Sequence, residues 1–169
     1  MSGNKISLAQ MLQRREQRAL TQKIFLAQHN SPLVSFSMNI PGPVKTNDLI
    51  RKAFDIGEVL LLDSLARLNA KILAADEIHQ DTGDELLLSV DGVSPETLKN
   101  MAVSIENSSP VGRLFDIDII DTNGQKLSRE VFRTCLICNK QAQDCARSRN
   151  HTVKELQDAV AILLASNLS

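Results

Sequence analysis

Residues 112–120, with the sequence GRLFDIDII, place two aspartates inside an apolar run. In an extended chain successive side chains point to opposite faces, so Asp116 and Asp118 share one face with Leu114 and Ile120. Two carboxylates on one face repel each other unless a cation lies near them, which indicates a shared divalent metal. The alternative is a solvated strand face, because polar and apolar residues normally alternate in half-buried antiparallel strands.

Hydrophobic periodicity predicts an α+β fold, with helices flanking a small and mostly antiparallel sheet. The chain has 169 residues, enough for a core, and no linker or repeat divides it, so we expect residues 1–169 to form a single domain. Helices are expected over residues 8–29, 47–75 and 94–110 and from 152 onward. Strands are expected over residues 33–40, 85–90 and 112–120.

Short motifs support several of these elements. Ser7 with Gln10 and Thr152 with Glu155 form capping boxes, which predict the starts of the first and last helices. The pair Asn123-Gly124 is typical of a type I′ hairpin, so the aspartate strand is expected to pair with residues 126–131. A helix, a strand with two aspartates on one face and a hairpin return are typical of nucleotidyltransferases, which hold divalent metals against a triphosphate.

Composition limits the possible partners. The net charge is −1, and the chain has neither Trp nor Tyr and only five Phe, so a nucleic-acid partner is not expected. We expect no membrane partner and a cytoplasmic location, because no apolar stretch is long enough to span a bilayer and the N-terminus lacks a secretory apolar segment. Three cysteines crowded into eleven residues are typical of reduced thiols rather than of a disulfide framework.

The three cysteines and a histidine have residue types that suit zinc. Cys135, Cys138, Cys145 and His151 could bind Zn²⁺ tetrahedrally, although their spacing is unusual. The alternative is that the cysteines pack as small apolar groups. Arginines flank the set and provide a competing explanation, in which the segment binds a diphosphate or another phosphate group. These arginines are Arg133, Arg147 and Arg149.

Two basic features have structural as well as functional interpretations. The turn at residues 41–43, Pro-Gly-Pro, is favoured as a structural turn, although it presents Lys45, which would suit phosphate contact. Arg14, Arg15 and Arg18 indicate a solvated helix face, or a docking surface for an acidic partner.

Three separated segments together resemble the apo-citrate lyase phosphoribosyl-dephospho-CoA transferase family. They are PLVSFSMNIPGPVK at 32–45, GRLFDIDII at 112–120 and RTCLICNKQAQDCARSRNH at 133–151. The resemblance implies transfer of the phosphoribosyl-dephospho-CoA group from 2′-(5″-triphosphoribosyl)-3′-dephospho-CoA to a serine of the apo acyl carrier protein subunit of citrate lyase, with release of pyrophosphate. The expected partners are therefore that carrier subunit and the triphosphoribosyl substrate.

The resemblance also suggests roles for individual residues. Asp116 and Asp118 match metal ligands, here for Mg²⁺. The sequence identifies no general base for the serine, and Asp118 and Glu106 are only candidates for it. Substrate phosphates are expected to meet residues that match the family's motifs or neighbour them, namely Lys45, Gly112, Arg113, Arg133, Arg147 and Arg149. The runner-up is a non-enzymatic, zinc-stabilised module that binds an acidic carrier protein through its basic first helix.

Overall fold

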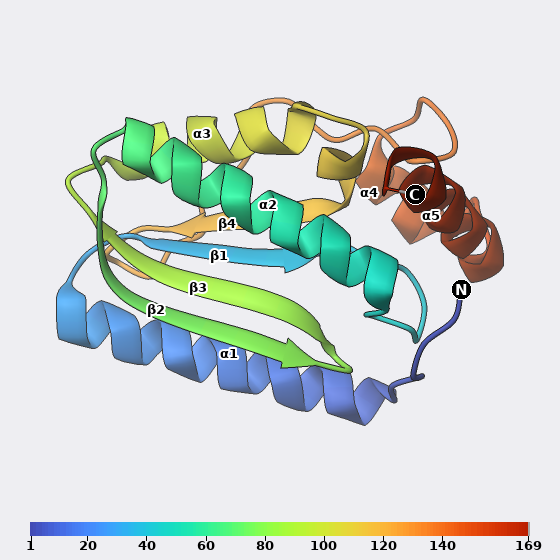
Figure 1. Ribbon diagram of the computed structural model, residues 1–169, viewed down its shortest axis with the longest axis horizontal. Coiled ribbons are helices and arrows are strands. Elements are labelled where there is room, and N and C mark those ends of the chain that lie inside the picture. Colours follow the sequence, from blue (N-terminus) through green and yellow to red (C-terminus); the bar gives the residue numbers. More distant parts are fainter. Residues whose placement is uncertain (169) are drawn as a thin grey trace.

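A four-stranded antiparallel sheet organises the fold, with its strands in the order β2-β3-β1-β4 (Figure 1). The computed structural model describes residues 1–168. The strands are β1 (Leu33–Met38), β2 (Lys71–Gln80), β3 (Gly83–Asp91) and β4 (Phe115–Ile120). The helices are α1 (Leu8–His29), α2 (Asp48–Arg67), α3 (Pro95–Asn107), α4 (Ala142–Ser148) and α5 (Val153–Leu168), with a 3-10 turn, η1 (Val111–Leu114), before β4. The predicted α+β class is confirmed.

Helices α2 and α3 cover one face of the sheet, and α1 covers the other (Figure 1). The main core lies under α2 and α3. There Phe36 of β1 stacks on Phe54 of α2 with 4.8 Å between ring centroids, and it meets Phe115 edge-on at 5.5 Å. A Cβ atom at Gly57 would lie 2.4 Å from the ring of Phe36, so only glycine allows α2 to approach the sheet this closely.

The face beneath α1 has a much smaller apolar cluster. Leu33, Leu87 and Ile120 are buried there, with Phe25 and Leu26 from the C-terminal half of α1 packed against them. Strand positions beneath the N-terminal half of α1 are instead partly polar. This division of the sheet into an apolar and a polar region positions most of the residues considered below.

Both capping boxes form as predicted. At α1, Ser7 Oγ accepts a hydrogen bond from Gln10 N at 3.2 Å, and Gln10 Oε1 accepts one from Ser7 N at 2.7 Å. At α5, Thr152 Oγ1 accepts from Glu155 N at 3.2 Å, and Glu155 Oε2 accepts from Thr152 N at 2.7 Å. Each pair satisfies two backbone donors that the first helical turn would otherwise leave free.

The helix expected over residues 47–75 is wrong at its C-terminal end. Helix α2 ends at Arg67, Asn69 takes the left-handed conformation with φ of +53°, and β2 begins at Lys71. Residues 71–75 have helix-like spacing, yet they belong to a strand that pairs with β3 along a hairpin. Backbone pairing with β3 therefore overrides the local preference.

The hairpin expected after β4 also differs. A type I′ turn needs positive φ at both Asn123 and Gly124, and only Gly124 has it, at +80°. The Asp121 side chain instead accepts hydrogen bonds at 2.9 Å from the backbone N–H groups of Asn123 and Gln125. The return segment makes one bridge, between Ile120 and Lys126, and then leaves the sheet edge rather than forming a strand to residue 131.

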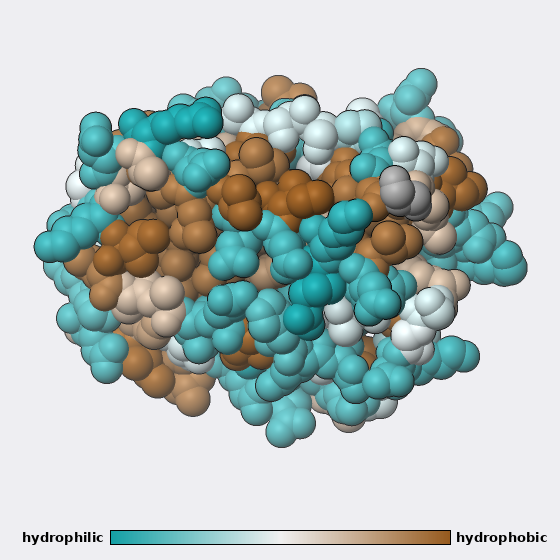
Figure 2. All heavy atoms as spheres, viewed as in Figure 1, coloured by the Kyte–Doolittle hydropathy of each residue, from teal (hydrophilic) through white to brown (hydrophobic). Residues whose placement is uncertain are grey.

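Apolar and polar side chains alternate over the face formed by α2 (Figure 2). Ile56, Val59 and Leu62 of this helix are among the exposed apolar residues. Within residues 1–168, none of the helices combines the length and apolar character needed to cross a bilayer.

Candidate functional site

Asp116 and Asp118 lie on the same face of β4, as predicted, on the side that α1 covers. Asp116 pairs across the sheet with Ser37 and Asp118 with Ser35. The expectation that Leu114 shares this face is wrong, because Leu114 belongs to η1 and is buried in the main core. Burial and then the charge of Asp118 raise the pKa of Asp116 above its ordinary range. Lys126 Nζ lies 2.7 Å from Asp118 Oδ2 and partly balances that charge.

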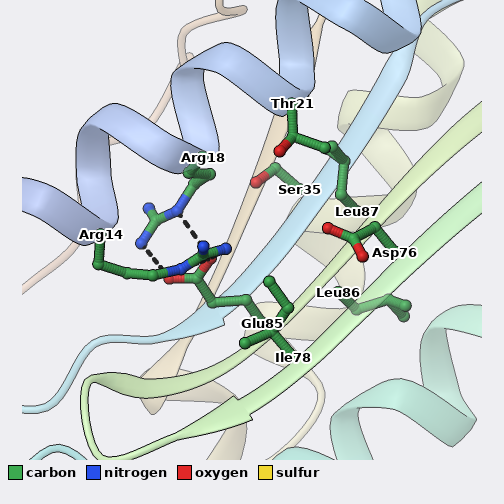
Figure 3. Close-up of a pocket in the computed structure, with 9 residues that line it drawn as sticks. All are labelled: Arg14, Arg18, Thr21, Ser35, Asp76, Ile78, Glu85, Leu86 and Leu87. Carbon is green, nitrogen blue, oxygen red and sulfur yellow. Dashed lines mark hydrogen bonds and ion pairs between the residues drawn. The ribbon is translucent and has the colours of Figure 1, made fainter.

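The row of residues that contains Asp116 continues into an ion-paired cluster beneath α1. Ser37 pairs with Asp116 on one side and with Glu85 of β3 on the other. Arg14 Nη2 lies 2.7 Å from Glu85 Oε2, and Arg18 Nη2 lies 2.5 Å from Glu85 Oε1 (Figure 3). The small cavity at this cluster, about 10 Å³, has room for roughly one water molecule.

This cluster corrects the interpretation of the basic helix. The Arg14 side chain is only 8% exposed and points toward the sheet with Arg18, so neither belongs to a solvated face (Figure 3). Arg15 is the exposed member of the three. The sequence offered no signal for Glu85, since its partners are 71 and 67 residues away along the chain.

Arg113 lies in η1 rather than in a strand. Its Nη2 donates to the carbonyl oxygens of Thr134 at 3.0 Å and Cys135 at 2.9 Å, which ties the start of β4 to the cysteine-rich segment. Gly112 explains how η1 reaches this position. A Cβ at Gly112 would lie 2.7 Å from the carbonyl oxygen of Glu106, so glycine lets the chain pack against the end of α3.

Lys45 is half-buried beside the Pro-Gly-Pro turn. Its Nζ donates to the carbonyl oxygen of Ile40 at 2.6 Å. Burial, followed by the charge of Arg15, lowers the pKa of Lys45. Gly42 has φ of +80°, and a Cβ there would overlap the amide of Gln157, so the turn is packed against α5. Lys45 therefore closes this turn, and it lies apart from the arginines described next.

Glu106 of α3 is buried, 3% exposed, and it holds two arginines at the edge of the sheet. Its Oε1 accepts a hydrogen bond from Ile117 N at 2.9 Å and pairs with Arg133, while its Oε2 lies 3.3 Å from Arg129 Nη2. Arg133 Nη2 also donates to the carbonyl oxygen of Phe115 at 2.7 Å. The carboxylate of Glu106 is thus buried and shared between two arginines, which argues against its role as general base.

A groove of about 1450 Å³ opens between α3, η1 and the segment that follows β4. Arginines line it from several elements, and Glu106 is the only acid among its described lining residues. The arginines are Arg113, Arg129, Arg133 and Arg149. Arg149 ends α4 with φ of +49°. The groove thus brings together three of the arginines expected from sequence and adds Arg129, whereas Lys45, Gly112 and Arg147 lie outside its lining.

The cysteine and histidine side chains converge, as a metal site requires. Ligand atoms of Cys135, Cys138, Cys145 and His151 all lie within 4.8 Å of one another. Cys138 Sγ is 3.5 Å from Cys145 Sγ and 3.3 Å from His151 Nε2. Burial would raise the pKa of Cys135, but hydrogen bonds from the backbone N–H groups of Cys138 and Ile137 and from the thiols of Cys138 and Cys145 together lower it. Three thiols and one imidazole suit a metal ion such as zinc.

Comparison with known proteins identifies the family. A model of the apo-citrate lyase phosphoribosyl-dephospho-CoA transferase family matches residues 6–167. The chain belongs to this family. The match covers α1 through α5 and therefore includes the aspartate pair, the arginine groove and the cluster of Cys135, Cys138, Cys145 and His151 in one family unit. The resemblance inferred from three short segments is confirmed.

Relatives of the apo-citrate lyase phosphoribosyl-dephospho-CoA transferase family come from diverse bacteria. A protein of Escherichia coli O139:H28 with the family's name is 32% identical over 167 residues, which cover 96% of this chain and 91% of the relative. Two others are each named "Probable apo-citrate lyase phosphoribosyl-dephospho-CoA transferase". The one from Streptococcus pyogenes serotype M18 is 38% identical, covering 98% of this chain and 88% of its own. The one from Vibrio cholerae serotype O1 (strain M66-2) is 36% identical, covering 89% and 87%.

Proposed function

We propose that this chain is a transferase that attaches phosphoribosyl-dephospho-CoA to a serine of the apo acyl carrier protein subunit of citrate lyase. The donor is 2′-(5″-triphosphoribosyl)-3′-dephospho-CoA, and pyrophosphate is released. The observation that carries the proposal is the family match over residues 6–167, supported by full-length relatives with this activity in their names.

The proposed reaction is a nucleotidyl transfer at phosphorus. The serine Oγ of the carrier attacks the α-phosphorus of the triphosphate and forms a phosphodiester bond. The bond between that phosphorus and the bridging oxygen breaks, pyrophosphate leaves, and the serine proton passes to a base. The nucleophile therefore comes from the partner. Glu106 is buried and ion-paired, and Asp118 is paired with Lys126 and would bind Mg²⁺, so neither carboxylate is free to act as that base.

Asp116 and Asp118 would bind Mg²⁺. The donor set fits, because Mg²⁺ in phosphoryl-transfer sites commonly uses one or two carboxylates and completes its shell with water and substrate phosphates. The raised pKa of Asp116 fits as well, since the two nearby carboxylates lack a full counter-charge in the chain itself. The ion would neutralise charge that develops on the triphosphate.

Basic residues would bind the remaining phosphate charge. Arg113, Arg133 and Arg149 reach one groove, which suits bidentate contacts between guanidinium groups and phosphate oxygens. Gly112 would act by setting the position of η1. Lys45 and Arg147 lie outside the groove lining, so neither is assigned a phosphate contact in the groove.

Zinc would bind Cys135, Cys138, Cys145 and His151. All four donors belong to the protein, so the ion would have no open position and would stabilise the segment rather than take part in the chemistry. The competing non-enzymatic module loses support, because two of the three arginines of its docking helix are engaged by Glu85.

The test is the mass of the apo carrier subunit before and after incubation with this chain, the triphosphoribosyl donor and Mg²⁺. We expect an increase equal to one phosphoribosyl-dephospho-CoA group, together with pyrophosphate release. The same incubation with Asp116→Asn provides the matched control and should give little adduct. Unmodified carrier with the native chain, when the donor and carrier are shown to be intact, would refute the proposed activity.

A further inference from the structure

We propose that the arginine groove is the subsite for the dephospho-CoA half of the donor, with Phe132 stacked on the purine and the arginines on the 5′-diphosphate. This inference rests on the proposed function and deepens it. The donor carries two separate polyphosphates, a triphosphate and a diphosphate, and the chain offers two separate places for them. The aspartate pair lies on the α1 face of β4, whereas the arginines line the groove beyond the edge of β4.

The exposure of Phe132 sets it apart from the other aromatic residues. The chain has five Phe and neither Trp nor Tyr. Phe36, Phe54 and Phe115 are fully buried and Phe25 is half-buried, whereas Phe132 is 62% exposed and lines the groove. An exposed ring contributes little to the core of the folded chain, and base–aromatic stacking is a favourable use of it.

The charge beside Phe132 defines the second part of the ligand. Arg133 follows it directly, and Arg113, Arg129 and Arg149 line the same groove. The single carboxylate of Glu106 offsets only part of this charge. Arg129 Nε and Glu106 Oε2 are both buried without a hydrogen-bond partner among residues 1–168, so the pairing of charges at this wall is incomplete on both sides. A purine next to a diphosphate matches an exposed ring next to several guanidinium groups.

The geometry of Arg133 connects the two places. Its Nη2 donates to the carbonyl oxygen of Phe115, the residue directly before Asp116. A diphosphate at Arg133 would therefore lie beside the start of β4, next to Asp116 along the chain. One extended molecule would then occupy both regions, with the reacting triphosphate at Asp116 and Asp118.

Binding measurements on the full chain separate the purine from the phosphate contribution. The probes are dephospho-CoA and inorganic pyrophosphate, measured by titration calorimetry. We expect Phe132→Ala to weaken dephospho-CoA binding about tenfold, the order expected for loss of one stacked base, and to leave pyrophosphate binding unchanged. Arg149→Ala should weaken both probes. Val131→Ala is the matched control, because Val131 is also exposed, at 78%, but has no ring.

Two results would overturn the inference. One is dephospho-CoA affinity that Phe132→Ala leaves within twofold of the native value. The other is equal weakening by Phe132→Ala and Val131→Ala. Phe132→Leu distinguishes stacking from simple apolar contact, since it should resemble Phe132→Ala. Carrier modification by the native chain together with either result would reject the subsite and retain the proposed function. If Phe132→Ala weakens dephospho-CoA binding as expected but the native chain does not modify the carrier, the subsite is retained and the proposed function is rejected.

Discussion

The Glu106 carboxylate accepts a hydrogen bond from the backbone N–H of Ile117, with 2.9 Å between Oε1 and N. Strand β4 is an edge strand, and its outward backbone groups would otherwise be free to pair with another chain. Side chains occupy them instead: Arg133 takes the carbonyl oxygen of Phe115, and Lys99 Nζ lies 3.4 Å from that of Ile117. Glu106 thus both protects the sheet edge and holds two of the groove arginines, Arg129 and Arg133.

Glu106→Gln should destabilise the fold strongly. It removes the charge that Arg129 and Arg133 share in a buried setting, and breaking a buried ion pair in this way costs about 3–5 kcal/mol. The free energy of unfolding from urea titration measures the effect. Glu130→Gln, an exposed neighbouring change, should cost less than about 0.5 kcal/mol. Similar values for both variants would contradict a structural role for Glu106.

Asp116→Asn and Asp118→Asn should each abolish most transfer without unfolding the chain. Asn keeps the shape of the side chain and removes its charge, so the rate should fall on the order of 10²- to 10³-fold, the size of losing one electrostatic contact to a transition state. Carrier modification rates measure this loss. Asp55→Asn, on the exposed face of α2, should keep the native rate. Chelation of Mg²⁺ should stop the native enzyme, and Mg²⁺ or Mn²⁺ should restore it; near-native rates for both aspartate variants would exclude the metal site.

The stability of the metal-free chain should depend on pH through Asp116. Burial and the charge of Asp118 raise the folded-state pKa of this acid above its ordinary value of 3.8. The folded state therefore holds the proton more tightly, and this contribution to stability is lost as pH rises from about 3.8 through the raised pKa. Asp116→Asn lacks the effect, so its stability relative to the native chain should increase as pH rises through that window. Urea titrations in the presence of chelator, at pH values below and above this window, measure the difference in the free energy of unfolding between the two proteins. A difference that does not change with pH would contradict the prediction.

Purified protein should contain about one equivalent of zinc. Cys138→Ala removes a ligand from the centre of the cluster, so it should release the metal and loosen residues 135–151. Elemental analysis and hydrogen exchange over this segment measure the two effects. Asn139→Ala, an exposed change between the ligands, should keep the metal. Protein that is metal-free yet folded and active would instead favour simple packing of the cysteines.

Arg14→Ala should destabilise the chain where Arg15→Ala does not. The Arg14 side chain is 8% exposed and donates two hydrogen bonds to Glu85, whereas Arg15 is exposed. Arg18 still pairs with Glu85 in the variant, so we expect a loss of about 1–3 kcal/mol rather than the cost of a fully unpaired charge. Thermal and urea unfolding of the two variants provide the comparison. Equal stability of the two variants would contradict a buried, ion-paired Arg14.

Local signals predicted the parts of the fold that short-range physics controls. The capping residues Ser7 and Thr152 formed the expected bonds, and the period of a strand correctly placed Asp116 and Asp118 on one face. The end of α2 was not predictable in this way. Residues 71–75 suit a helix locally, and only pairing with a strand that comes later in the chain makes them part of β2.

The candidate site divides in the same manner. Ligand types within one short segment were sufficient to identify the cluster of Cys135, Cys138, Cys145 and His151. The roles of Arg14 and Glu106 depend on partners that the fold brings from distant elements. A charged residue such as Arg14 is predicted to be exposed when no partner is known. In the fold Glu85 of the facing strand is that partner, so Arg14 is buried.

Arg149 lies between two members of the metal-binding cluster, Cys145 and His151, and it also lines the groove. A metal ion that joins the four ligands would therefore restrict the conformations of the Arg149 side chain before the donor binds. The groove wall would then lose its conformational entropy during folding rather than on binding, so the donor would bind with a more favourable free energy. A zinc ion bound at the cluster would therefore increase the affinity for the donor without contacting it.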